Sequence, residues 1–443
     1  MDTLLFYLGC ILMVCLSTAE YKYVLQRQEI NSDESPPTVP ETKEGMMIMS
    51  NFVESSDIVI RKLLKDEERG QCRLEPEQKF PCKNIKSSKH IPDSVHKLRP
   101  ADIQVVAALG DSITVGVGAG AESVLDIGKR YRGVSFSSGG AGTWRDVVTL
   151  PNILKIFNPY LYGASSNMSS GLNYARAGAT SKELLSQAKR LVHDMYRDPR
   201  INVHKDWKMI TILIGMFVQK KKRVDEFEDA SVEGYGYNIR RALDYLYRHL
   251  PRTFVNLVPM ADVTLTLDLV NKPGYCYLLH WYFCPCLFDD IFSKRMSKWQ
   301  MKTQLRHYMN KIEHLINMGM YDNRDDFTVV IQPSLVNGII PKKYDRVFKR
   351  KVPDLSYLAP DCFHFSQKLH ALVSRSLWNN LLQPVGQKAT DWSKQEVPFL
   401  CPSSTAPFLA TRKNSSLARR TRGSLMLDWL QFIRGSPKYT CTI

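Results

Sequence analysis

The chain has 443 residues, of which 44% are hydrophobic, and carries a formal net charge of +16 at pH 7. This length allows one large domain or two ordinary ones, and the hydrophobic content suffices for a sizeable core, which excludes a globally disordered protein. The positive charge favours contact with anionic lipid surfaces, although a solvated surface is the simpler interpretation of any single basic run. No module typical of nucleic-acid binding is present, so we expect no nucleic-acid partner.

The chain begins with a compact apolar block, Leu4–Leu16, followed by small residues at positions 17–19. This order is typical of a secretory signal peptide comprising residues 1–19, although Asp2 and the lack of Lys or Arg before the block are unusual. An uncleaved anchor is the alternative, but a membrane span needs about 20 apolar residues. We therefore expect a secreted, soluble chain.

Removal of residues 1–19 leaves eight cysteines, namely Cys72, Cys82, Cys276, Cys284, Cys286, Cys362, Cys401 and Cys441. An even number in an oxidising compartment favours disulfide bonds, but the sequence does not reveal their pairing. Cys284 and Cys286 lie too close together to pair easily with each other. No spacing typical of zinc ligands occurs, and we expect neither a metal nor a cofactor. Sequons at Asn167 and Asn414 fit glycosylation, although such triplets also arise by chance.

Residues 20–80 are polar and rich in Pro, Lys and Glu, which is typical of a flexible lead-in. Apolar runs begin in the segment that follows. Continuous apolar runs predict strands that are buried on both faces, and four such runs cover residues 103–109, 207–215, 254–260 and 327–333.

Segments with helical periodicity alternate with these runs and cover residues 181–196, 235–250, 298–319 and 368–382. Gly319 is expected to cap the third helix. Strands that alternate with long helices predict an α/β fold, a three-layer α/β/α sandwich with a central parallel sheet, over residues 81–390. Residues 391–443 are basic and polar again, and we expect a largely disordered tail there.

The first apolar run ends at Gly110, Asp111 and Ser112, where α/β proteins commonly bind substrates. A lone Gly-Asp-Ser tripeptide is more often an ordinary turn. Serine is a weak nucleophile unless a histidine accepts its proton and a carboxylate orients that histidine. If Ser112 is a nucleophile, both partners must come from elsewhere in the chain.

Such a pair occurs just before the last predicted helix, where Asp361 and His364 lie three residues apart. One short turn can present both side chains to the same place, with Asp361 holding the imidazole and Nε2 facing the nucleophile. An isolated Asp-x-x-His is more simply a surface loop. The combination with Ser112 is stronger, because the two motifs flank about 250 residues of alternating strands and helices.

In these motifs and their order, the sequence resembles the GDSL (SGNH-type) lipase/esterase family, most closely its phospholipase B branch. The resemblance covers about residues 80–415 and implies a flavodoxin-like hydrolase that cleaves acyl esters of phospholipids and lysophospholipids at a membrane or micelle surface. That branch often has tandem units and a C-terminal anchor, whereas we find one unit and expect no anchor. The blocks that carry the resemblance are residues 99–119, 150–163, 171–179, 206–215, 254–258, 359–366, 377–386 and 401–415.

The resemblance implies roles for individual residues. Ser112 matches the nucleophile, and Asp361 and His364 complete a catalytic triad. The backbone N–H groups of Ser112 and Gly178 match two donors of the oxyanion hole. Without the family match, Gly178 would be interpreted as a turn glycine.

One block departs from the family pattern. The family has Gly-x-Asn-Asp after the second long strand, and this Asn is an oxyanion donor, whereas Phe217 and Val218 occupy these positions here. Loss of one such donor lowers the rate by about 10²–10³, or about 3–4 kcal/mol. Three interpretations stay open: a weakened hydrolase, a pseudoenzyme or lipid-binding relic of the same fold, and a segment (216–227) that reflects an altered exon junction.

Overall fold

The computed structural model describes residues 69–71, 79–83, 86–215, 231–270, 272–283, 298–346, 349–393 and 398–415. The signal peptide predicted for residues 1–19 lies outside these ranges, as do Phe217 and the cysteines at positions 72, 284, 286 and 441.

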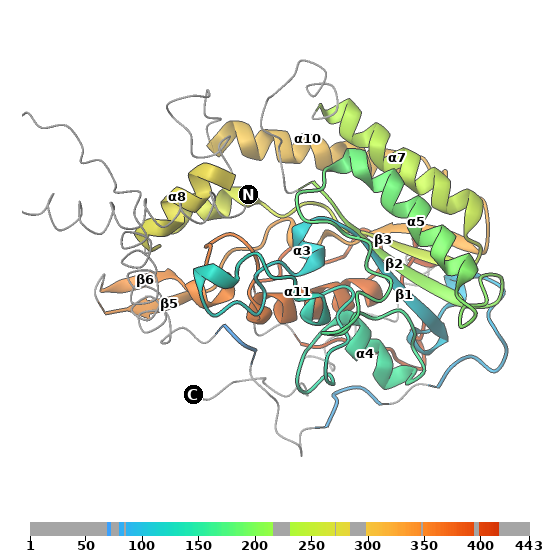
Figure 1. Ribbon diagram of the computed structural model, residues 1–443. Helices are drawn as coiled ribbons and strands as arrows, with labels where there is room; N and C mark the ends of the chain where they lie inside the picture. Colours follow the sequence, from blue (N-terminus) through green and yellow to red (C-terminus); the bar gives the residue numbers. More distant parts are fainter. Residues whose placement is uncertain are drawn as a thin grey trace, which may run out of the picture.

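A four-stranded parallel sheet forms the centre of the domain (Figure 1). Its strands follow chain order and correspond to the four apolar runs: β1 (Ile103–Gly110), β2 (Trp207–Leu213), β3 (Thr253–Leu257) and β4 (Phe327–Ile331). Gly110 pairs with Leu213, and Ile212 pairs with Leu257, so the carboxyl ends of β1, β2 and β3 meet at one edge of the sheet.

Helices cover both faces of this sheet, as Figure 1 shows. Val105, Ala107 and Leu109 pack with one set of helices, whereas Val106 packs with the other set, because successive strand residues point to opposite faces. The first set is α5 (Leu184–Arg197), α7 (Val232–His249) and α10 (Lys298–Asn317), and the second is α4 (Leu150–Phe157) and α11 (Gln367–Leu382). The predicted three-layer α/β/α sandwich with a central parallel sheet is confirmed.

The predicted helices occur with small shifts at their ends. The helix expected from residue 181 begins as a 3-10 turn, and α5 proper starts at Leu184. Gly319 lies two residues beyond the end of α10 with a φ of +74°, in the left-handed region where glycine commonly terminates helices.

Several shorter elements were not predicted. They are helices α3 (Ser112–Val115) and α8 (Gly274–Phe283), the antiparallel pair β5 (Lys342–Asp345) and β6 (Arg350–Pro353), and 3-10 turns η1 (Val95–Lys97), η2 (Pro100–Asp102), η3 (Val124–Asp126), η4 (Arg132–Val134), η6 (Val263–Asp268), η7 (Pro333–Leu335) and η8 (Leu355–Tyr357). Helix α4 was not predicted either. It spans only eight residues, too few for a clear helical period.

Residues 398–415, which the composition placed in a tail, pack onto the domain instead. Cys401 forms a disulfide bond with Cys82, and Leu409 is fully buried in the core between the sheet and α11. The rings of Phe80 and Phe399 meet edge to face at 5.1 Å beside this disulfide. A few buried apolar side chains and one cross-link thus order a segment whose average composition is polar.

Candidate active site

Ser112 lies at a sharp turn from β1 into α3. Gly110 has a φ of +152°, and a β-carbon there would lie 2.1 Å from the carbonyl oxygen of Leu213, so the turn requires glycine. The side-chain amide of Gln187 on α5 both donates to and accepts from the Gly110 backbone, at 2.9 and 2.8 Å. These contacts fix the end of β1 and therefore the position of the serine that follows.

Asp111 supports the same turn through both of its carboxylate oxygens. Its Oδ1 accepts the N–H of Ile113 at 3.1 Å and so caps α3. Its Oδ2 accepts the N–H of Gly215 at 3.2 Å, which ties the end of β1 to the residues that follow β2. No role for Asp111 was predicted from the sequence, although an Asp directly before a helix is a typical N-cap.

Asp361 and His364 lie in one tight loop before α11. The N–H of Ala359 donates to the carbonyl oxygen of His364 at 2.8 Å and closes the loop. Within it, Oδ1 of Asp361 accepts the N–H groups of Phe363 and His364 at 3.0 and 2.9 Å. One oxygen of the carboxylate is thereby used to hold the loop, and the other is left to face the imidazole.

The structure brings Ser112, Asp361 and His364 into one line of hydrogen bonds. Oδ2 of Asp361 lies 2.5 Å from Nδ1 of His364, and Nε2 of His364 lies 2.9 Å from Oγ of Ser112. All three side chains are buried, with relative exposures of 2%, 7% and 1% for Asp361, His364 and Ser112. This arrangement can move a proton from the hydroxyl to the imidazole.

The electrostatics of the Asp361 carboxyl group fit this arrangement. Burial alone would raise its pKa, but the attraction of His364 and the hydrogen bonds from His364 and Phe363 hold the pKa below its ordinary value. The group is therefore an anion at neutral pH and can hold the proton on Nδ1 of His364. That leaves Nε2 free of a proton and able to accept one from Ser112.

Gly178 lies in an exposed loop next to the end of β1. The N–H of Arg176 donates to the carbonyl oxygen of Gly110 at 3.1 Å, which places this loop beside the Ser112 turn. Gly178 has a φ of +75°, and no described residue other than its two chain neighbours has an atom within 4 Å of the point where its β-carbon would be. Phe217 lies outside the described residues, but Gly215, two positions before it, contacts Asp111.

The two sequons differ in their surroundings. Asn167 is exposed in the loop between α4 and α5. Asn414 is half-buried, and its Nδ2 donates to the carbonyl oxygens of His96 and Leu409 at 3.0 and 2.8 Å. A glycan would have to be attached to this same nitrogen.

The part of the chain that the structure describes contains no group of three or more His, Cys, Asp or Glu residues that could hold a metal ion. Nor does any helix within it have the length and apolar character needed to cross a membrane.

Comparison with known proteins agrees with this geometry. The family model described as GDSL-like Lipase/Acylhydrolase matches residues 106–377, a range that contains Ser112, Asp361 and His364. The match covers more than half of the chain, so the chain belongs to the GDSL-like lipase/acylhydrolase family, as its motifs predict.

Individual proteins within this family are also similar to the chain. The chain is 40% identical over 365 residues to "Phospholipase B1, membrane-associated" of Rattus norvegicus, covering 80% of this chain and 25% of that protein. The protein of the same name from Mus musculus is 41% identical over 77% of this chain and 23% of its own length. This chain thus spans about a quarter of the length of these relatives. The crystal structure of an extracellular lipase from Streptomyces rimosus is 13% identical, with a TM-score of 0.26 over 60% of this chain and 95% of that one, too low to support any conclusion.

Proposed function

We propose that this chain is a serine-dependent lipase that hydrolyses acyl ester bonds of phospholipids and lysophospholipids. The observation that carries the proposal is the line of hydrogen bonds from Asp361 through His364 to Ser112. The choice of substrate rests on the phospholipase B1 relatives, which the chain matches over about four fifths of its length.

In the proposed reaction, Oγ of Ser112 attacks the acyl carbonyl while Nε2 of His364 accepts the hydroxyl proton. His364 then returns this proton to the leaving alcohol, and an acyl-enzyme on Ser112 remains. Water, activated by the same nitrogen, releases the fatty acid. Asp361 keeps the imidazole in the correct tautomer and stabilises the imidazolium that forms in each step.

The oxyanion of each tetrahedral intermediate would be held by the backbone N–H groups of Ser112 and Gly178. Neither group donates a hydrogen bond to another described residue, so both are available for a substrate oxygen. Phe217 stands where the resemblance places the family's third donor, an asparagine side chain. We therefore propose a hydrolase that works with two donors and is slower than one with three, by about 10²–10³-fold.

We also propose that the chain is secreted, is glycosylated and acts on lipid aggregates. The apolar block near the N-terminus and the two described disulfide bonds, Cys82–Cys401 and Cys276–Cys362, support an oxidising compartment. The net charge of +16 favours anionic membrane or micelle surfaces.

The alternative is a catalytically impaired relic that binds lipid but turns over little. Phe217 is the observation that favours it, because phenylalanine cannot donate a hydrogen bond and its ring could fill the pocket. The intact geometry at Ser112, His364 and Asp361 favours the hydrolase.

The decisive experiment compares the parent with Ser112→Ala for fatty-acid release from lysophospholipid micelles and for labelling by a fluorophosphonate. We expect the parent to release fatty acid and take the label on Ser112, and the variant to do neither. Equal release by the two proteins would contradict the proposed hydrolase. Labelling without release would instead support the impaired relic, because the nucleophile would be activated and turnover would not follow.

The variant Phe217→Asn tests the missing donor. We expect fatty-acid release to rise by up to about 10²–10³-fold, since an asparagine amide would add the third oxyanion donor. Phe217→Leu is the matched control, because it shortens the apolar side chain without adding a donor. A similar gain in both variants would show that the aromatic ring blocked the pocket, and no gain in either would exclude the lost donor as the cause of low activity.

A further inference from the structure

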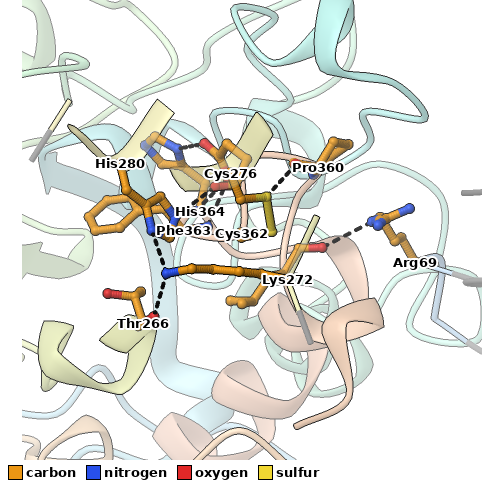
Figure 2. The surroundings of a disulfide bond; sticks show 11 residues. Arg69, Thr266, Lys272, Cys276, His280, Pro360, Cys362, Phe363 and His364 are labelled. Carbon is orange, nitrogen blue, oxygen red and sulfur yellow. Dashed lines mark hydrogen bonds and ion pairs between the residues drawn. A yellow bond between two sulfur atoms is a disulfide. The ribbon is translucent and has the colours of Figure 1, made fainter. Parts of the chain in front are cut away.

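The loop that carries Asp361 and His364 is attached to a helix outside the central sandwich. Cys362, between the two residues, forms a disulfide bond with Cys276 on α8, and both cysteines are buried (Figure 2). One turn further along α8, Nε2 of His280 lies 2.9 Å from the carbonyl oxygen of Asp361. Helix α8 therefore holds the loop at two adjacent residues, once covalently and once by a hydrogen bond.

The loop has a conformation that needs such support. Cys362 has a φ of +57°, in the left-handed region that costs a residue with a β-carbon about 1–3 kcal/mol. Strained backbone of this kind persists only where its surroundings fix it. Besides the disulfide bond, the N–H of Cys362 donates to the carbonyl oxygen of Ala359 at 2.9 Å.

The chemistry around His280 defines its tautomer. Nδ1 of His280 lies 3.5 Å from Nζ of Lys272, as Figure 2 shows, and an ammonium group can only donate, so Nδ1 must be the acceptor. Nε2 then carries the proton and donates it to the carbonyl oxygen of Asp361. Burial lowers the pKa of His280 to about 4, with a further contribution from Lys272, so the ring is neutral at neutral pH.

We infer that His280 and the Cys276–Cys362 disulfide bond are positioning elements for the catalytic loop, which hold the backbone of Asp361 so that its carboxylate stays aligned with Nδ1 of His364. This inference rests on the proposed hydrolase. Neither His280 nor the cysteines touch the reacting atoms; they act through Asp361. Misplacement of a catalytic group by about 1 Å can lower a rate about 10²-fold.

The test uses two variants that differ in reach. His280→Gln keeps an amide nitrogen that can reach the Asp361 carbonyl oxygen, whereas the shorter His280→Asn keeps the polarity and loses the contact. With a soluble acyl ester such as p-nitrophenyl butyrate, we expect His280→Asn to lower kcat about 10–100-fold at unchanged KM. His280→Gln should stay within about threefold of the parent.

The disulfide bond is tested in parallel with a matched control. Cys276→Ala/Cys362→Ala should lower kcat, whereas Cys82→Ala/Cys401→Ala, which removes the other described disulfide bond, should leave kcat unchanged below its Tm. Circular dichroism establishes that each variant is folded at the assay temperature. Equal losses of kcat in the two double variants would overturn the inference, because general destabilisation would explain both.

A second readout does not depend on turnover. The proton between Nδ1 of His364 and Asp361, which lie 2.5 Å apart, should give a low-field proton NMR resonance. We expect this resonance to weaken or shift in His280→Asn and to persist in His280→Gln. If Ser112-dependent turnover is absent but the resonance responds in this way, the proposed function fails and the positioning role stands. If neither kcat nor the resonance differs between the two variants, the positioning role is overturned.

Discussion

Asp361 divides its carboxylate between two tasks, and this division explains why the residue type matters. Oδ1 accepts two backbone N–H groups of its own loop, and Oδ2 faces Nδ1 of His364. An asparagine could satisfy the first task with its carbonyl oxygen. It would present an N–H group to Nδ1, which favours the tautomer with its proton on Nε2, and that nitrogen could not accept a proton from Ser112.

We therefore expect Asp361→Asn to fold and to lower kcat by a factor on the order of 10⁴, the size of the effect of this change in a serine-protease triad. Hydrolysis of p-nitrophenyl butyrate measures it. Asp354→Asn is the control, since Asp354 also caps a turn and accepts a backbone N–H, from Ser356, but has no contact with His364. A loss of less than tenfold for Asp361→Asn would show that Asp361 does not orient the imidazole.

The sequons lead to a second prediction for individual residues. Asn167 is exposed, whereas Nδ2 of Asn414 already donates two hydrogen bonds that join the segment around Leu409 to His96. We expect the chain, expressed in cells that glycosylate secreted proteins, to carry a glycan on Asn167 and none on Asn414. Peptide mass spectrometry checks this, and Asn167→Gln should abolish the mass shift that enzymatic deglycosylation produces. A glycan found on Asn414 would contradict the packing of residues 398–415.

Among the elements, β2 contains a feature that its apolar pattern conceals. Lys208 occupies its second position and is fully buried, with Nζ donating to the carbonyl oxygens of Val203 and Asp206 at 2.6 and 2.7 Å. Burial lowers its pKa to about 7; the charge of Asp206 opposes this shift, and that of Arg252 adds to it. A lysine can occupy a buried strand when its aliphatic stem is buried and its ammonium group is hydrogen-bonded, as Nζ is here.

The pH dependence that follows has a definite sign. Between about pH 7 and the ordinary lysine pKa of about 10.4, the unfolded chain binds a proton that the folded chain lacks, so the free energy of unfolding rises with pH. Lys208 alone can raise the free energy of unfolding by at most about 1.4 kcal/mol per pH unit. We expect the Tm of the parent, relative to Lys208→Met, to increase from pH 7 to pH 9.5. Lys189→Met, which removes an exposed charge, is the control, and a constant difference between parent and Lys208→Met would refute the prediction.

The elements also differ in how well their sequences reveal them. The four strands are mostly apolar and are buried on both faces, and α5 and α7 have an apolar stripe with helical spacing, so local patterns suffice. Helix α8 is rich in aromatic residues, and its sequence shows no clear apolar stripe with helical spacing. Contacts with the Asp361 loop hold it in place. The same contacts give His280 its place, and no local pattern indicates them.

For the whole molecule, the Cys82–Cys401 disulfide bond joins residues 319 positions apart and attaches the C-terminal segment to the start of the domain. Residues 398–401 also accept hydrogen bonds from α11: Nε1 of Trp378 donates to the carbonyl oxygen of Leu400 at 2.8 Å, and Nδ2 of Asn379 donates to that of Pro398 at 2.9 Å. The folded unit thus extends at least to residue 415, beyond the boundary that composition predicts.

A chain shortened to end at residue 393 lacks the Cys82–Cys401 disulfide bond, and loss of a native disulfide bond usually lowers the free energy of unfolding by about 2–5 kcal/mol. We expect a loss of this size or larger, because buried Phe399 and Leu409 are removed as well. A chain that ends at residue 415 keeps this segment and should unfold at a higher temperature than the one that ends at residue 393. Calorimetry of the two shortened chains measures the difference. Equal Tm values for both would place residues 398–415 outside the cooperative unit.

The sequence by itself determined the parallel α/β sandwich, because buried strands and amphipathic helices are local patterns, and its ordered motif blocks carried the resemblance to the family. It also singled out Ser112, Asp361 and His364 as partners. Only the tertiary structure decided the distances among them, the pairing of Cys276 with Cys362 and of Cys82 with Cys401, and the packing of residues 398–415 onto the domain. These depend on contacts between residues far apart in the chain, and local composition and periodicity carry no information about such contacts.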